Sequence, residues 1–188
     1  MKNTYIGQAW LVILLSLSFG AALATVQSAL NPKIEENRLQ DTIGQIPNLV
    51  PGAASGDAET IGEHVVYRAR DEQGEQVGWV LPASGQGFAD KISLLVGVDK
   101  EVTRITGLYI LDQKETPGLG NRIVEDDWRR QFVDRPLAKR LTLVKAAASA
   151  EDEIQGVTGA TISSESVVGI VNAAVAQLRV DLSGQGSK

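Results

Sequence analysis

The chain has 188 residues, with 18 Lys and Arg against 23 Asp and Glu, and a formal net charge of −5. It contains no cysteine and one histidine, so it lacks the thiolate and imidazole ligand sets of iron–sulfur clusters and of most haem and zinc sites. Any redox chemistry must therefore use an organic cofactor or the metal of a partner. The acidic balance and the lack of a basic tract argue against nucleic-acid binding.

The N-terminal segment has the composition of a membrane helix. No charged residue occurs from Ile6 to Val26, and this run of 21 residues is long enough to cross a bilayer core of about 30 Å. Lys2 precedes it, so the positive-inside tendency predicts a cytoplasmic N-terminus and places the rest of the chain on the far side. A signal peptide cleaved after Ala22-Leu23-Ala24 is the alternative. The length of the run favours an uncleaved anchor over residues 1–28.

Residues 29–58 are expected to connect this anchor to a folded domain. Asn31-Pro32 predicts a break in the first helix. A short amphipathic helix is then predicted, because Ile34, Leu39, Ile43 and Ile46 recur near helical spacing. Residues 48–56 are predicted to form a loop, and residues 53–63 show no periodicity.

Residues 59–182 are expected to form one domain, followed by a tail at 183–188. Two hairpins are predicted, one pairing 65–67 with 77–81 and one pairing 92–98 with 102–111, and a flexible glycine loop is expected at 84–88. A short helix is predicted around 126–132, a strand at 141–145 and an apolar-striped helix from Ser163. These elements predict an α+β fold, a mainly antiparallel sheet with flanking helices, preceded by a single N-terminal transmembrane helix.

The segment Thr158-Gly159-Ala160-Thr161 lies directly before the last predicted helix. A helix N-terminus presents unpaired N–H groups and a partial positive charge, so it attracts anions. A phosphate held there could also be esterified to Thr161. The alternative is an ordinary Ser/Thr cap of the helix.

A second segment, Glu115-Thr116-Pro117-Gly118-Leu119-Gly120, precedes this motif. Together the two segments resemble FMN-binding domains of the RnfG and NqrC type, which are membrane-anchored flavoprotein subunits of ion-translocating electron-transport complexes. The resemblance covers roughly residues 60–180 and, by length, is closer to the RnfG type. It implies that Thr161 carries FMN through a phosphoester, which a separate flavin transferase makes from FAD.

The same resemblance implies that the 115–120 loop lies against the isoalloxazine ring. Gly118 and Gly120 would allow close backbone approach, and Leu119 would cover the ring. The expected cofactor-binding residues are Thr158, Gly159, Ala160, Thr161, Glu115, Thr116, Gly118 and Leu119, with no catalytic residue and no metal ligand. The family often has an acidic residue three positions before its motif, where this chain has Gln155.

The expected function is electron transfer. A subunit with covalent FMN would relay electrons between the other membrane subunits of an Rnf-like complex, anchored in the lipid bilayer of the cytoplasmic membrane with its domain on the extracytoplasmic side. The alternative is a structural or assembly subunit that keeps the fold and holds no flavin. A hydrolase using Thr161 is disfavoured, because it needs a base beside the nucleophile and His64 is the only histidine. Trp79 and Trp128 are expected to pack rather than relay electrons.

Overall fold

The computed structural model describes residues 5–62 and 64–185. Lys2, on which the predicted membrane orientation rests, and residues 186–188 of the predicted tail lie outside the described residues. The chain divides between Asp41 and Thr42 into two compact units. The predicted boundaries at 28/29, 58/59 and 182/183 stay predictions.

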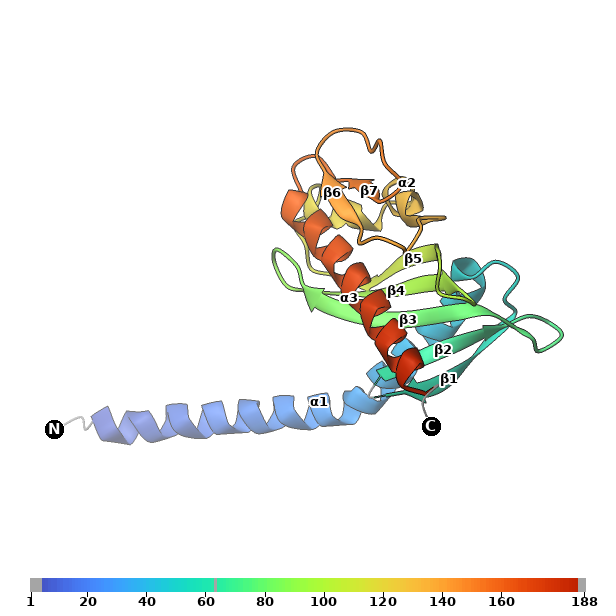
Figure 1. The fold of residues 1–188 in the computed structure, drawn as a ribbon. Coiled ribbons are helices and arrows are strands. Elements are labelled where there is room, and N and C mark those ends of the chain that lie inside the picture. The colour runs from blue at the N-terminus through green and yellow to red at the C-terminus, as the bar shows by residue number, and fades with distance from the viewer. Residues whose placement is uncertain (1–4, 63, 186–188) are drawn as a thin grey trace. The chain divides into compact units, whose positions relative to one another are not determined.

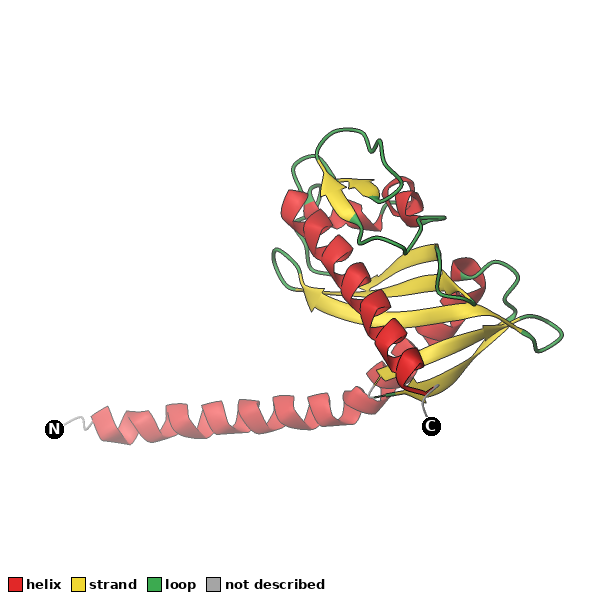
Figure 2. Ribbon diagram, viewed as in Figure 1, coloured by secondary structure: helices red, strands yellow, loops and turns green. Residues whose placement is uncertain are grey.

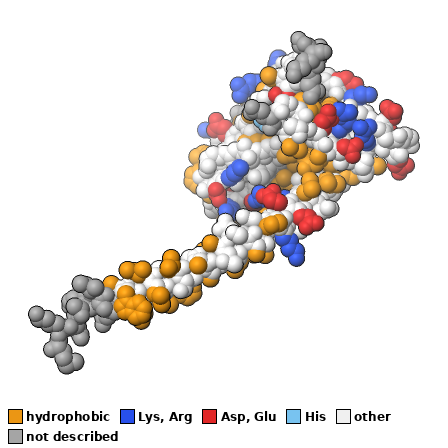
Figure 3. Space-filling view, turned by 90° about the horizontal axis from the view of Figure 1, so that it is seen from below, with side chains coloured by type: hydrophobic (Ala, Val, Ile, Leu, Met, Phe, Trp, Pro, Cys, Tyr) orange, Lys and Arg blue, Asp and Glu red, His pale blue; other side chains and the backbone are white. Residues whose placement is uncertain are grey.

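The first unit is formed by helix α1 (Tyr5–Leu49), whose last turns belong to the second unit. The predicted break at Asn31-Pro32 is wrong, because α1 continues through Pro32. Proline removes one N–H donor, but the residues around it are mostly good helix formers and keep the remaining bonds. Hydrophobic side chains are exposed along the described part of this unit (Figure 3). The stretch Ala9–Leu49 is long and apolar enough to cross a membrane.

The second unit is built on a five-stranded sheet whose strands follow chain order and pair antiparallel throughout (Figures 1 and 2). The strands are β1 (Ser55–Ile61), β2 (His64–Arg70), β3 (Gln76–Gln86), β4 (Lys91–Asp99) and β5 (Ile105–Asp112). Both predicted hairpins are confirmed. The predicted glycine loop at 84–88 is partly wrong, because β3 stays paired with β4 as far as Gln86.

Each face of the sheet is covered by a helix. Helix α3 (Thr161–Gln185) lies across one face (Figure 1), where Val167, Val171 and Val175 are buried in a core with side chains of β3 and β4. The end of α1 covers the other face with Ile46 and Leu49. The predicted α+β class is thereby confirmed. Although α3 is also long and apolar enough to cross a membrane, its buried residues make it the core helix of this unit.

A cross-strand pair of glycines lets α1 approach the sheet closely. Gly97 of β4 faces Gly107 of β5. A Cβ added to Gly97 would lie 2.5 Å from the Leu49 carbonyl oxygen, and a Cβ added to Gly107 would lie 2.8 Å from it. That oxygen accepts a hydrogen bond from the Thr106 hydroxyl at 2.6 Å. The two glycines therefore form the notch that receives the end of α1.

Between β5 and α3 the chain forms short elements, which are η1 (Gly120–Val124), α2 (Asp126–Arg129), η2 (Arg130–Phe132), β6 (Thr142–Val144) and β7 (Glu153–Gln155). β6 and β7 pair in parallel. Trp128 packs edge-on against Phe132 at 5.2 Å and donates to the Gln155 carbonyl at 2.8 Å, the packing role expected of it. This bond fixes the end of β7, from which the chain leads to Thr158 and the start of α3.

Candidate functional site

Thr161 is the first residue of α3, whereas the sequence predicted a helix start at Ser163. Its side chain is exposed, and its hydroxyl makes no hydrogen bond with any residue that the structure describes. The residue before it, Ala160, has no side-chain oxygen with which to cap the helix. Thr161 therefore does not serve as the helix cap.

The hydroxyls of Ser163 and Ser164, in contrast, are both engaged. The Ser164 hydroxyl donates to the Ala160 carbonyl at 2.9 Å and accepts from the Val157 N–H at 3.0 Å. The Ser163 hydroxyl donates to Glu115 Oε2 at 2.5 Å. The first N–H groups of α3 have no carbonyl partner within the helix and remain available to an anion.

The 115–120 loop turns at Gly118, which has a φ of +76°. Its N–H donates to Asn121 Oδ1 at 2.8 Å. No atom of the described residues lies within 4 Å of the position that a Gly118 Cβ would take, and the approach of its backbone to the isoalloxazine ring stays a prediction. At Gly120, in contrast, a Cβ would lie 2.8 Å from Ser163 Oγ and 2.9 Å from Glu115 Oε2. Gly118 thus supplies the left-handed turn, and Gly120 supplies the contact with α3.

Glu115 joins three segments of the chain. It is only 4% exposed. Its Oε2 accepts from Ser163 of α3, and its Oε1 accepts from the Ala89 N–H in the β3–β4 turn at 3.1 Å. A Cβ on Gly87 would lie 2.4 Å from Oε1, so this turn needs glycine where it meets the carboxylate. Glu115 therefore holds the loop, the turn and the helix start together.

These segments enclose a cleft of about 430 Å³. Its apolar walls are Phe88, Leu119 and Ile162, which are 61%, 47% and 53% exposed. Gly159 has a φ of +83°, and its missing Cβ would lie 3.1 Å from Leu119 Cδ2. The two sequence motifs thus meet in one cleft. The lining residues are Phe88, Glu115, Thr116, Leu119, Gly120, Gly159, Ala160, Thr161, Ile162 and Ser163.

Of the predicted site residues, six line this cleft: Glu115, Thr116, Leu119, Gly159, Ala160 and Thr161. Thr158 lines a smaller adjoining cavity, and Gly118 lines neither cavity. Sequence reasoning did not assign Phe88 or Ile162 to the site. An aromatic residue directly after the glycines of a turn was the available signal for Phe88.

The cleft suits a flavin. Exposed apolar side chains can cover a flat heteroaromatic ring, and the free hydroxyl of Thr161 lies at a helix N-terminus that favours a phosphate. Among the described residues no group of three His, Cys, Asp or Glu side chains could hold a metal ion. The residues present therefore fit FMN.

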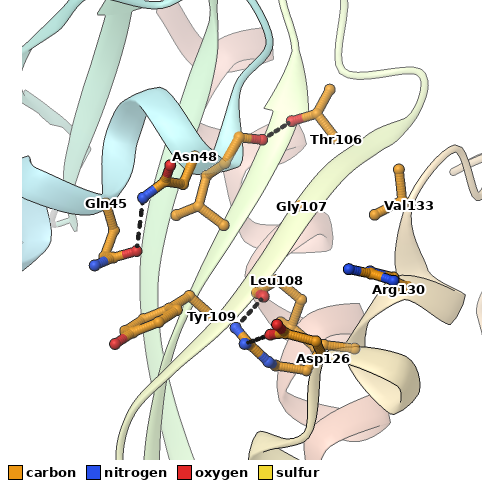
Figure 4. A pocket seen from close by; sticks show the side chains of 11 residues that line it. Gln45, Asn48, Thr106, Gly107, Leu108, Tyr109, Asp126, Arg130 and Val133 are labelled. Atoms are coloured by element: carbon orange, nitrogen blue, oxygen red, sulfur yellow. Dashed lines mark hydrogen bonds and ion pairs between the residues drawn. The ribbon is translucent and has the colours of Figure 1, made fainter.

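A larger cavity of about 490 Å³ lies between the end of α1 and α2 (Figure 4). Figure 4 shows Gln45 and Asn48 on one side and Asp126 and Arg130 on the other. Arg129, which also lines it, is paired with Asp126, donates to the Leu108 carbonyl at 3.1 Å and stacks over Tyr109 at 5.2 Å. The guanidinium of Arg130, the second arginine of this cavity, lies 3.8 Å from Asp127 Oδ1. The cavity contains none of the predicted site residues and both of its arginines have acidic partners, so it does not compete as the flavin site.

Comparison with known proteins agrees with this geometry. A model of the FMN-binding domain family matches residues 87–176, a range that includes both motifs. The fold is similar to the crystal structure of NqrC from Shewanella oneidensis, with a TM-score of 0.53 and 21% identity over 69% of this chain and 70% of that chain. The fold and the site thus define an FMN-binding domain protein.

The lengths over which two relatives match distinguish the RnfG type from the NqrC type. The G component of the ion-translocating oxidoreductase complex from Methanosarcina acetivorans is 30% identical over 164 residues, which cover 86% of this chain and 84% of that protein. The C component of the Na(+)-translocating NADH-quinone reductase from Haemophilus ducreyi is 33% identical over 108 residues, which cover 54% of this chain and 42% of that protein. The chain belongs to the RnfG-type family of ion-translocating oxidoreductase subunits, as its length predicted.

Proposed function

We propose that this chain is an electron-transfer subunit of an ion-translocating oxidoreductase complex of the Rnf type and that it carries FMN covalently on Thr161. The observation that carries the proposal is the free, exposed hydroxyl of Thr161 at the start of α3, facing an apolar cleft. The family match and the RnfG-type relatives support the same assignment. FMN supplies the redox chemistry, and the protein positions it and limits access to it.

A covalent bond explains how such an open site keeps its cofactor. The helix N-terminus stabilises an anion by about 0.3–1 kcal/mol at an exposed position, which is too little to retain a flavin. A flavin transferase using FAD would form the bond from Thr161 Oγ to phosphorus and release AMP, while the hydroxyl proton passes to solvent. The product keeps one negative charge beside the helix N-terminus.

The residues of the cleft would act on the bound cofactor by position. Leu119 and Phe88 would cover the ring and exclude water from its faces. Glu115 would keep the loop and the helix start in register, because its carboxylate is held by both Ser163 and Ala89. The anchor in α1 would hold the domain at the cytoplasmic membrane, on the extracytoplasmic side, next to the other membrane subunits with which it exchanges electrons.

The test is the intact mass of the chain purified from its complex or after co-expression with a flavin transferase. We expect the unmodified mass plus one FMN less one water. Thr161→Ala should abolish this addition, whereas Thr142→Ala, at an exposed threonine that lines neither the flavin cleft nor the smaller adjoining cavity, should retain it. Flavin fluorescence in a denaturing gel should follow the same pattern.

An unmodified wild-type mass under these conditions would reject the proposal and favour a structural or assembly subunit. Flavin attached to Thr161→Ala would place the bond elsewhere in the chain. Thr161→Ser, which keeps a hydroxyl at the position, should retain some loading.

A further inference from the structure

Thr161 lies where two cavities meet. Beside the flavin cleft there is a smaller cavity of about 250 Å³. The two share Gly159 and Thr161, so a group attached to the Thr161 oxygen can reach into either of them. The smaller cavity is lined by Leu143, Val144, Lys145, Gly156, Val157, Thr158, Gly159 and Thr161.

The parallel pair β6–β7 brings Lys145 to this cavity. Val144, at the end of β6, is in register with Gln155 of β7, and its carbonyl accepts from the Gly156 N–H at 2.9 Å. The residues that follow the two strands therefore run side by side, Lys145 after β6 and the segment leading to Thr158 after β7. Leu143 packs against the core and keeps β6 in place.

The charges around Thr161 single out this lysine. Among the described residues that line the two cavities, Lys145 is the one cation and Glu115 the one anion. The Glu115 carboxylate is already bound by Ser163 and Ala89. Lys145 has no ion pair with any residue that the structure describes, and its side chain is exposed. A phosphodiester on Thr161 would introduce the anion that this lysine lacks.

We propose that Lys145 binds the phosphate of the cofactor on Thr161, so that the phosphate lies at the smaller cavity, which Lys145 lines, and the flavin ring lies in the cleft lined by Phe88 and Leu119. This inference rests on the proposed covalent attachment. Lys145 would act together with the N-terminus of α3, each from its own side of the phosphate. Its contribution is to orient the linkage and to limit the motion of the flavin.

The test compares Lys145→Gln and Lys145→Glu with Lys139→Gln, an exposed lysine that lines neither cavity. All are purified with covalent flavin from the full chain, and the loading is measured by intact mass. The readouts are the ³¹P NMR shift of the phosphodiester and the time-resolved fluorescence anisotropy of the flavin. We expect Lys145→Gln to move the ³¹P signal and increase the fast anisotropy decay, Lys145→Glu to do so more strongly, and Lys139→Gln to match wild type.

Varying the salt concentration gives a second test of the contact between Lys145 and the phosphate, and it needs no mutation. Raising NaCl from about 10 mM to about 1 M shortens the Debye length from about 30 Å to about 3 Å and weakens exposed ion pairs. The wild-type ³¹P shift should move towards that of Lys145→Gln, and the Lys145→Gln signal should move less.

Loaded Lys145 variants with the wild-type ³¹P shift and anisotropy would overturn the inference while leaving the attachment intact. A wild-type chain without covalent flavin would instead contradict the proposed function. The contact between Lys145 and the phosphate would then be contradicted as well. Lower loading of both Lys145 variants, with normal loading of Lys139→Gln, would support the contact.

Discussion

At the scale of single residues, Glu115 and Thr161 are two polar side chains of the cleft whose burial and hydrogen bonding are opposite. Glu115 is buried with both carboxylate oxygens bound, and Thr161 is exposed with a hydroxyl that makes no bond to any residue the structure describes. The first arrangement gives the site its shape, and the second leaves an oxygen available for chemistry. A substitution at each position should therefore have a different consequence: lost stability at Glu115 and lost cofactor at Thr161.

We predict that Glu115→Gln destabilises the fold. The Gln amide can keep both contacts, with its oxygen accepting from the Ala89 N–H and its NH₂ donating to the Ser163 hydroxyl, but the carboxylate acceptor is lost, and the weaker neutral bonds should lower the free energy of unfolding by about 1 kcal/mol. Urea denaturation of the chain in detergent micelles measures the loss. Glu101→Gln, at an exposed turn position, should change the free energy of unfolding by less than about 0.5 kcal/mol. Equal stability of the two variants would show that Glu115 does not hold the segments together.

At the scale of elements, the turn between β4 and β5 depends on one carboxylate. Asp99 Oδ1 accepts from the N–H groups of Thr103 at 2.6 Å and Arg104 at 3.0 Å, and Oδ2 accepts from the Thr103 hydroxyl. Partial burial alone raises the pKa of Asp99, but these hydrogen bonds outweigh it and hold the pKa below its ordinary value. The same turn holds Val102 at a φ of +55°, a conformation that a β-branched residue rarely adopts.

The lowered pKa of Asp99 gives a pH dependence with a defined sign. The stabilisation is complete above the unfolded-state pKa of about 3.9 and is lost as the pH falls through the lower folded-state pKa. At pH 7 we expect wild type to be more stable than Asp99→Asn by about 1 kcal/mol, since bonds to a charged acceptor are the stronger ones. The difference should shrink as the pH falls below about 4, measured by urea denaturation at each pH. A difference that is constant from pH 7 to pH 3 would contradict this account.

The sequence predicted the elements that have an apolar pattern of their own. The hairpins β2–β3 and β4–β5 and the helix α3 were found by their alternation or their stripe. β1 was missed, because it is an edge strand with the mostly polar sequence Ser55–Ile61 and shows no buried alternation. β7 is three residues long and is defined by its partner β6 rather than by its own composition.

For the site as well, the sequence predicted some features and missed others. The two motifs and their pairing were visible in the sequence through a family resemblance. The bond between Glu115 and Ser163 was not, because it joins residues 48 positions apart and exists only once α3 has packed on the sheet. Gly97 and Gly107 carried an unused signal, since glycine inside a strand often marks a close backbone approach.

At the scale of the whole molecule, the domain does not begin where the apolar run ends. The last turns of α1 and the residue after them supply Ile46, Leu49 and Val50 to the core on one face of the sheet, where they contact Tyr67 and Leu95 among others. The second unit accordingly starts at Thr42. These residues follow the membrane segment in the sequence, but they are part of the folded domain.

We therefore predict different outcomes for two truncations. A chain beginning at Thr42 should unfold cooperatively in urea. A chain beginning at Gly52 should lose on the order of 5 kcal/mol, because three buried aliphatic side chains contribute about 1.5–3 kcal/mol each. A loss of that size approaches the whole stability of a small domain, so we expect aggregation or a low urea midpoint. Equal urea midpoints for the two chains would show that the end of α1 is dispensable.

The exposure of the Thr161 oxygen has a consequence for the order of biogenesis. Its neighbours Ala160, Ser163 and Ser164 are buried, yet the oxygen itself is at the surface of the finished fold. A maturation enzyme can therefore modify the domain without unfolding it. Under the proposed covalent attachment and extracytoplasmic location, the polypeptide would cross the membrane and fold as a bare chain and would receive the flavin last, so that the export machinery would not have to pass a rigid heteroaromatic group.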